Sequence, residues 1–203
     1  MKKSSAVKIF LIAFLATAFV YGLVLPFMWG NNPLDEHGTL SLLCEDAGKQ
    51  IYFWIWGLLT CGSISANVLY MYKKFSYKNR FLVALCVMSV ISVCLVALTL
   101  GHSIDSWNRN PKRILHWVAT GMYIVFTVAP ILLFFLINIK RYKGMIPLAL
   151  CTVGIFMTFV FIFAFVGKSG LMEMVPIALM EIFLLIVNFT PLVRPQLKNH
   201  QKK

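Results

Sequence analysis

Charged residues are scarce in this sequence, and acidic residues are the scarcest. The 203 residues include seven Asp and Glu against 19 Lys and Arg, and charged residues make up 13% of the chain. A soluble domain normally has about 25% charged residues. Hydrophobic residues reach 60%, with a mean hydropathy of +0.80. This composition excludes an ordinary water-soluble domain and indicates a polytopic membrane protein.

The sequence also lacks the short motifs of several enzyme classes. It has no GxxxxGK[ST] or GxGxxG phosphate-binding loop, no GxSxG elbow, and no CxxC, HExxH or HxxxH spacing. Of the five cysteines, four fall inside apolar segments and Cys44 falls in a predicted loop, so no pair is set up to form a disulfide. We therefore expect no metal and no cofactor.

Six apolar stretches are long enough to cross a bilayer core, which takes roughly 20 helical residues. They comprise residues 8–30, 50–72, 80–101, 114–138, 145–167 and 170–191. The first stretch begins like a signal peptide, but its apolar run continues to Gly30, so we predict a retained span. The sequence predicts one all-α domain, a six-transmembrane-helix bundle with a short basic tail at 192–203.

The distribution of basic residues predicts the orientation of this bundle. Most of them lie at the N terminus, in the second and fourth connections and in the tail, where no acidic residue accompanies them. By the positive-inside rule both termini are cytoplasmic. The aromatic residues fit belts at the two membrane surfaces, with Trp54, Trp56 and Trp117 outside and Tyr70 and Tyr72 inside. The basic clusters are topology signals, so we expect no nucleic-acid partner.

Polar residues recur at helical spacing inside three of the predicted spans. Asn67 belongs to such a stripe in the second span, Tyr123 and Thr127 to one in the fourth, and Glu181 and Asn188 share a face of the sixth. Polar groups that face lipid would be unsatisfied, so these stripes should face each other or a wet cavity. Glu181 is the most costly of these residues to bury. Its presence in the span is explained either by a functional role or by a purely structural interaction with a polar residue on another helix.

The predicted outer loops carry the remaining reactive groups. Asp46 lies in the first loop, and His102, Asp105 and His116 lie in or next to the third. These residues are weak candidates for acid–base catalysis or for a divalent metal ion. Solvated loops that contact lipid headgroups explain the same residues, since no motif shows that the two loops converge.

Four segments resemble the Frag/DRAM/Sfk superfamily of six-span membrane proteins, which includes the damage-regulated autophagy modulators. They are "SLLCEDAGKQIYFWIWGLL", "GHSIDSWNRNPKRILHWVATGMYIVF", "PIALMEIFLLIVNF" and the basic exit from the second span, "NVLYMYKKF". The resemblance matches Asp46 and Gly48 in the first segment, His116 in the second and Glu181 in the third. The sequence departs from the pattern at Glu45 and Ile182 and at the pair after the histidine. A related prokaryotic family of unknown function is similar too.

The resemblance implies a multi-pass membrane protein of lipid organisation, lipid remodelling or membrane trafficking, without catalytic activity. Its partners would be membrane lipids and other membrane or cytoplasmic proteins. The location would be the plasma membrane or endolysosomal membranes in a eukaryote and the cell membrane in a prokaryote. Two alternatives stay open: a proton- or cation-coupled transporter or channel that uses Glu181, and a membrane-embedded lipid-modifying enzyme with an outer acid and histidine site.

Overall fold

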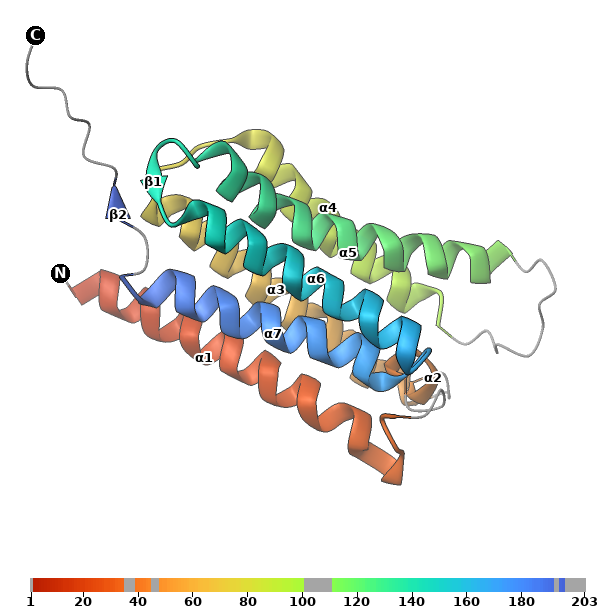
Figure 1. Cartoon of the computed structure of the whole chain (residues 1–203). Helices are drawn as coiled ribbons and strands as arrows, with labels where there is room; N and C mark the ends of the chain where they lie inside the picture. The colour runs from red at the N-terminus through yellow and green to blue at the C-terminus, as the bar shows by residue number, and fades with distance from the viewer. Residues whose placement is uncertain (1, 35–38, 45–47, 101–110, 192–193, 196–203) are drawn as a thin grey trace, which may run out of the picture.

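Six long helices run side by side in the computed structural model, which describes residues 2–34, 39–44, 48–100, 111–191 and 194–195 (Figure 1). These helices are α1 (Lys2–Val24), α3 (Gln50–Lys74), α4 (Arg80–Leu98), α5 (Pro111–Ile137), α6 (Met145–Phe165) and α7 (Gly170–Phe189). Each one contains a segment long and apolar enough to cross a membrane. The predicted all-α bundle is confirmed, and the chain is a multi-pass integral membrane protein.

Five of the six spans end one to three residues earlier than the hydropathy predicted, and the second ends two residues later. They cover Ser5–Met28, Gln50–Lys74, Arg80–Leu98, Ile114–Ile137, Met145–Phe165 and Gly170–Phe189. Helix α4 ends where the Thr99 hydroxyl donates to the Leu95 carbonyl at 2.8 Å, and α6 ends just before Gly167, whose φ is 84°. A glycine in this left-handed conformation is a common helix terminator. Hydropathy does not detect these ends because the residues around them are still apolar.

Short elements mark the two ends of the bundle (Figure 1). At one end, α1 begins and α7 finishes, and β1 (Tyr142–Lys143) pairs antiparallel with β2 (Arg194–Pro195). We call this the terminal end. At the opposite end lie the 3-10 helix η1 (Leu25–Gly30) and the one-turn helix α2 (Leu40–Leu43). We call it the α2 end.

Helix α3 occupies the centre of the bundle and contacts α1, α4, α5 and α7. A Cβ atom added to Gly57 of α3 would lie 3.0 Å from Cγ2 of Val93 on α4, so this glycine permits the close approach of the two helices. Helix α4 packs along α5, and α6 packs on α5 and α7 at the periphery. The polar face of α3 is therefore enclosed by other helices.

The half of the bundle near the terminal end is filled by a tight aromatic core. Phe134 of α5 is fully buried, and its ring centroid lies 5.3 Å from those of Tyr72 and Tyr77 and 5.6 Å from that of Phe75. The Tyr72 hydroxyl donates to the Pro130 carbonyl at 2.8 Å. Aromatic rings at these separations add to the stabilisation from burial itself.

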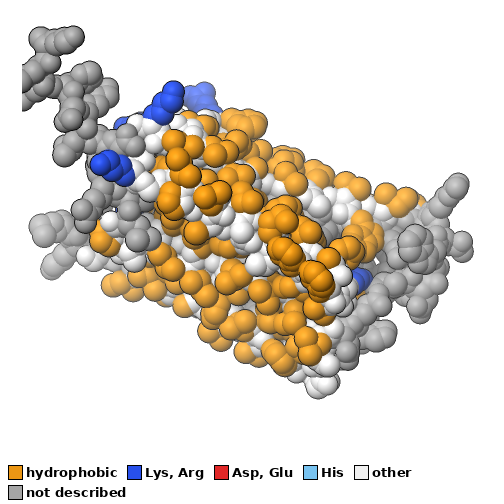
Figure 2. Space-filling model, in the orientation of Figure 1, with side chains coloured by type: hydrophobic (Ala, Val, Ile, Leu, Met, Phe, Trp, Pro, Cys, Tyr) orange, Lys and Arg blue, Asp and Glu red, His pale blue; other side chains and the backbone are white. Residues whose placement is uncertain are grey.

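Two residues assigned to the aromatic belts lie in the core instead. Trp56 is 5% exposed and packs against Phe53, and Tyr72 is 3% exposed. Both belong to α3, which is surrounded by other helices, and this explains why they do not reach the membrane surface. The exposed surface is mostly hydrophobic along the bundle, and Lys and Arg gather near β1 (Figure 2).

Candidate functional site: a cavity between α5, α6 and α7

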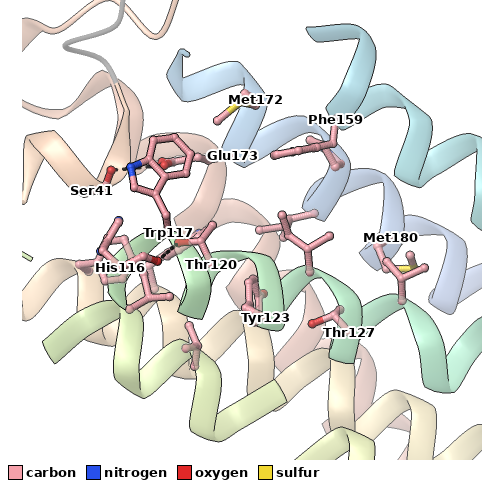
Figure 3. Close-up of a pocket in the computed structure, with 18 of the residues that line it drawn as sticks. Ser41, His116, Trp117, Thr120, Tyr123, Thr127, Phe159, Met172, Glu173 and Met180 are labelled. Atoms are coloured by element: carbon pink, nitrogen blue, oxygen red, sulfur yellow. Dashed lines mark hydrogen bonds between the residues drawn. The ribbon is translucent and has the colours of Figure 1, made fainter. Parts of the chain in front are cut away.

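A cavity of about 160 Å³ lies between α5, α6 and α7 in the half of the bundle near the α2 end. Figure 3 shows Trp117, Thr120, Tyr123 and Thr127 on α5, and Met172, Glu173 and Met180 on α7. Side chains of α3 and α4 complete the wall, and most of the lining is apolar. Apolar walls with a few polar groups are typical of small-molecule sites.

The cavity is elongated along α5. Its lining residues on this helix run from His116 to Val128, which corresponds to about 18 Å at the α-helical rise. His116, Thr120, Tyr123 and Thr127 recur at spacings of three and four, so one face of α5 supplies them. The volume is similar to that of a cavity that holds benzene (~150 Å³), but here it extends along the helix. This elongated shape fits an extended acyl chain better than a ring system.

Glu173 closes the α2 end of the cavity by binding α2. Its carboxylate accepts hydrogen bonds from the Leu40 backbone N–H at 2.6 Å and from the Ser41 hydroxyl at 3.4 Å. The backbone N–H of Leu171 also donates to the Pro33 carbonyl at 3.2 Å. Pro33 and α2 are thus held against the first turn of α7, and Ser41 becomes part of the cavity wall.

A cation lies at the same end of the cavity. Lys168, in the turn between α6 and α7, places its Nζ 5.7 Å from the centre of the Trp117 ring. This is a cation–π distance. Lys168 also attracts the Glu173 carboxylate. The rim therefore combines an ammonium group, a carboxylate and a half-exposed indole.

His116 sits on the rim and is oriented by α4. Its Nδ1 lies 3.1 Å from the Thr99 hydroxyl, and its carbonyl accepts a hydrogen bond from the Thr120 hydroxyl at 2.8 Å. The contact joins the C-terminal end of α4 to the first turns of α5. His116 is one of the residues that line the cavity.

The deep end of the cavity is formed by Tyr123 and Thr127. Tyr123 is 8% exposed, and its hydroxyl has no hydrogen-bond partner of ordinary geometry among the described residues, with Thr127 and Glu181 close by. Oγ1 of Thr127 lies 2.7 Å from Oγ of Ser89, which in turn lies 3.4 Å from Sγ of Cys61. Thr127 thus pairs with α4, a partner that the sequence did not suggest.

Beyond Tyr123, a buried polar network joins α3 to α7. Glu181 is 1% exposed and accepts a hydrogen bond from the Ser63 hydroxyl at 3.3 Å. The Asn67 amide donates to the Ser63 carbonyl at 3.0 Å, and the Asn188 amide donates to the carbonyl and side-chain oxygens of Asn67 at 3.0 and 3.1 Å. Lys74 ends the network by donating to the carbonyls of Val187 and Asn188.

The predicted intramembrane residues therefore lie in two connected groups. Glu181, Asn67 and Asn188 form the network, and Tyr123 and Thr127 line the adjacent cavity. His116 lies at the other end of that cavity. The candidates Asp46, His102 and Asp105 fall outside the described residues. Within the part of the chain that the structure describes, no group of three or more His, Cys, Asp or Glu side chains is placed to hold a metal ion.

Sequence reasoning missed the rim formed by Glu173, Lys168 and Ser41. In the sequence these residues are only charged and polar groups at the predicted end of a span, and nothing in their spacing relates them to one another. The signal that marks the rim is an acidic residue in the first turn of an apolar helix, where a carboxylate is favourable. Its partner, α2, was predicted as loop because four residues carry too little periodicity to indicate a helix.

Cys44 follows α2 and is fully buried beside it. Burial, together with the negative charge of Glu173, raises the pKa of the Cys44 thiol to about 11. The thiol is therefore protonated and unreactive at neutral pH. Nearby, Gly48 has a φ of 94°, a left-handed conformation that favours glycine over any other residue.

A scan against protein-family models, a search of curated proteins and a search of solved structures each found no match.

Proposed function

We propose that the protein is a non-catalytic membrane factor that binds a membrane lipid in the cavity between α5, α6 and α7 and acts in lipid organisation or membrane trafficking. The observation that carries the proposal is the shape and chemistry of the cavity. It is a narrow apolar slot about 18 Å long with a polar rim at one end. A lipid with one acyl chain in the slot and its headgroup at the rim matches both parts.

The rim chemistry favours a headgroup that contains a phosphate. Lys168 supplies a positive charge, and the Ser41 hydroxyl and the His116 ring add polar atoms at the same end of the cavity. Trp117 is half-exposed there, as expected for an indole at the depth of the headgroups. The acyl chain would then run past Ile124 and Ile177 toward the deep end.

In this proposal the α2 end faces outward and the terminal end faces the cytoplasm. The support is the positive-inside rule, because the connections at the terminal end carry Lys73, Lys78, Arg80, Lys140 and Arg141 without an acidic residue. The same clusters would attract anionic lipid or an acidic cytoplasmic partner. Labelling single cysteines at positions 49 and 78 with an impermeant reagent in intact cells tests the orientation, since only position 49 should react.

The resemblance to the Frag/DRAM/Sfk superfamily supports the lipid-handling proposal. It matches Gly48, His116 and Glu181, which lie around the first connection, on the cavity rim and in the network behind the deep end. Replacing Asp46, His116 or Glu181 by Ala tests whether they serve one site. Activity in a lipid-remodelling or lipid-asymmetry assay should fall further than protein abundance. If activity only follows abundance, the shared site is wrong.

Native mass spectrometry of the purified protein tests lipid binding itself. The wild type should retain one phospholipid, and Thr120→Phe, which fills the slot, should release it. Thr158→Phe is the matched control, because both threonines donate to a backbone carbonyl of their own helix and Thr158 does not line the cavity. Equal lipid retention in both variants would show that the lipid does not bind in the cavity.

A proton-coupled transporter is the second candidate function, and the polar chain from Tyr123 to Lys74 favours it. Intramembrane carboxyl groups often mark proton or cation pathways. Proteoliposomes that carry out no Glu181-dependent ion or proton flux would exclude transport of the ions tested. The alternative of a lipid-modifying enzyme receives no comparable support, since three of its four candidate residues lie outside the described part of the chain.

A further inference from the structure

The cavity and the Glu181 network meet at one side chain. Tyr123 lines the deep end of the cavity, and its hydroxyl interacts electrostatically with the Glu181 carboxyl, although no hydrogen bond joins the two groups. Glu181 itself does not line the cavity, and Tyr123 is a lining residue that interacts with it. A tyrosine hydroxyl both donates and accepts hydrogen bonds. This one forms no hydrogen bond of ordinary geometry with a described residue, although its side chain is nine-tenths buried.

Glu181 has no positive charge beside it in the described part of the chain. Its one hydrogen bond there comes from the Ser63 hydroxyl, at a long 3.3 Å. Lys74 is held near the terminal end by the carbonyls of Val187 and Asn188. The titratable and charged groups around this region are Cys61 on α3, Cys86 on α4, Tyr123 on α5 and, near the terminal end, Lys74 on α3 and Lys8 on α1.

Three buried oxygen atoms of this region lack hydrogen bonds within the described residues: Oγ1 of Thr60, the Tyr123 hydroxyl and Oδ1 of Asn188. Unpartnered polar atoms inside a protein are usually bridged by ordered water. A carboxylate without a counter-charge at mid-membrane depth is costly, and a bound proton removes that cost. Water at Tyr123 would connect such a proton to the cavity.

We propose that Glu181 is a proton-binding site that exchanges its proton with the cavity through the Tyr123 hydroxyl. For uptake, a hydronium ion in the cavity gives a proton to the Tyr123 oxygen and is left as water, while the tyrosine O–H passes its own proton through a bridging water to a Glu181 oxygen. One O–H bond forms and one breaks at each step, and the carboxylate ends as a neutral carboxylic acid. The inference requires the cavity to admit water, and it does not depend on lipid binding.

Infrared spectroscopy of the reconstituted protein tests this site directly. The wild type should show the carbonyl stretch of a protonated carboxyl group, and this band should shift in D₂O. Glu181→Gln should remove the band, whereas Glu173→Gln, the control at the other described acidic residue, should keep it. A wild-type protein without the band, or a band that survives in Glu181→Gln, would overturn the proposal.

Two milder variants test the route and do not depend on the folding of Glu181→Gln. Ser63→Ala removes the hydrogen bond to Glu181 and should change the band frequency. Tyr123→Phe removes the hydroxyl and should slow the D₂O shift at least tenfold with the band frequency nearly unchanged. An exchange rate in Tyr123→Phe equal to that of the wild type would overturn the role of Tyr123.

Discussion

The two halves of the bundle are built differently. Near the terminal end, Phe134, Phe135 and Tyr72 interlock with neighbouring rings and are at most 3% exposed. Near the α2 end, the same helices enclose a cavity of about 160 Å³, and a carboxylate holds α2 against its rim. A densely packed half fixes the helices, and the hollow half leaves space that a ligand can occupy.

The polar network lies at the boundary between these halves. Asn67 and Asn188 tie α3 to α7 on the packed side, while Glu181 and Ser63 lie next to the deep end of the cavity. Hydrogen bonds between membrane helices fix their relative position more than they add stability. The residues of the packed half therefore hold the bundle together, and those of the hollow half are available to a ligand.

The largest expected effect is on the free energy of unfolding, and it should differ between the two halves of the bundle. Phe134→Ala should lower the free energy of unfolding by about 3–5 kcal/mol, the usual cost of emptying a fully buried aromatic site. Phe159→Ala, on the half-buried cavity wall, should cost no more than about 1 kcal/mol, because it enlarges a space that already exists. Equilibrium unfolding in a bilayer or bicelle measures both. Equal losses would show that the α2 half is as tightly packed as the terminal half.

A smaller effect is expected at the rim, where Glu173 holds α2. In a variant that retains only Cys44, Glu173→Gln should increase the rate of maleimide alkylation of Cys44 about tenfold at neutral pH, which corresponds to about 1.4 kcal/mol in total. Two causes act together, because α2 is released and the charge that raises the thiol pKa is removed.

The pH dependence of this alkylation has a defined sign. Because the Cys44 pKa is raised to about 11, the reactive thiolate should stay rare in the wild type until the pH approaches that value. The stability that the buried thiol contributes is complete below its ordinary pKa of 9 and is lost between pH 9 and 11. Fast alkylation at neutral pH in the variant that retains only Cys44 would contradict the buried position of this thiol.

The smallest effect concerns the network at the boundary. A double-mutant cycle of Asn67→Ala and Asn188→Ala should give a coupling energy of about 0.6 kcal/mol and no more than about 1.7 kcal/mol, the range for hydrogen bonds between membrane helices. Thr190→Ala is a suitable control, since its hydroxyl bonds within its own helix. A coupling energy of zero would mean that the two amides do not interact in the membrane.

The sequence predicted the spans and the polar faces well because both follow from periodicity. Apolar length marks a span, and the spacing of Asn67, Glu181 and Asn188 places them inside the bundle whatever the details of packing. Helix ends were less accurate, because they depend on single residues such as Thr99 and Gly167.

The cavity and its rim were beyond prediction for a physical reason. They depend on contacts between residues far apart in the chain, such as Glu173 with Leu40 or Lys168 with Trp117. The burial of Trp56 is another such effect, since the side chain has the character of a membrane-surface residue and only the central position of α3 encloses it.

Photocrosslinking with a phospholipid that carries a diazirine on its acyl chain tests whether the cavity binds lipid. The account predicts saturable labelling of residues 116–128 of α5 and 172–180 of α7, the cavity walls, with loss of this labelling in Thr120→Phe and in an excess of unlabelled phospholipid. Labelling confined to lipid-exposed residues such as Leu150 and Phe161 of α6, unchanged by Thr120→Phe, would contradict it.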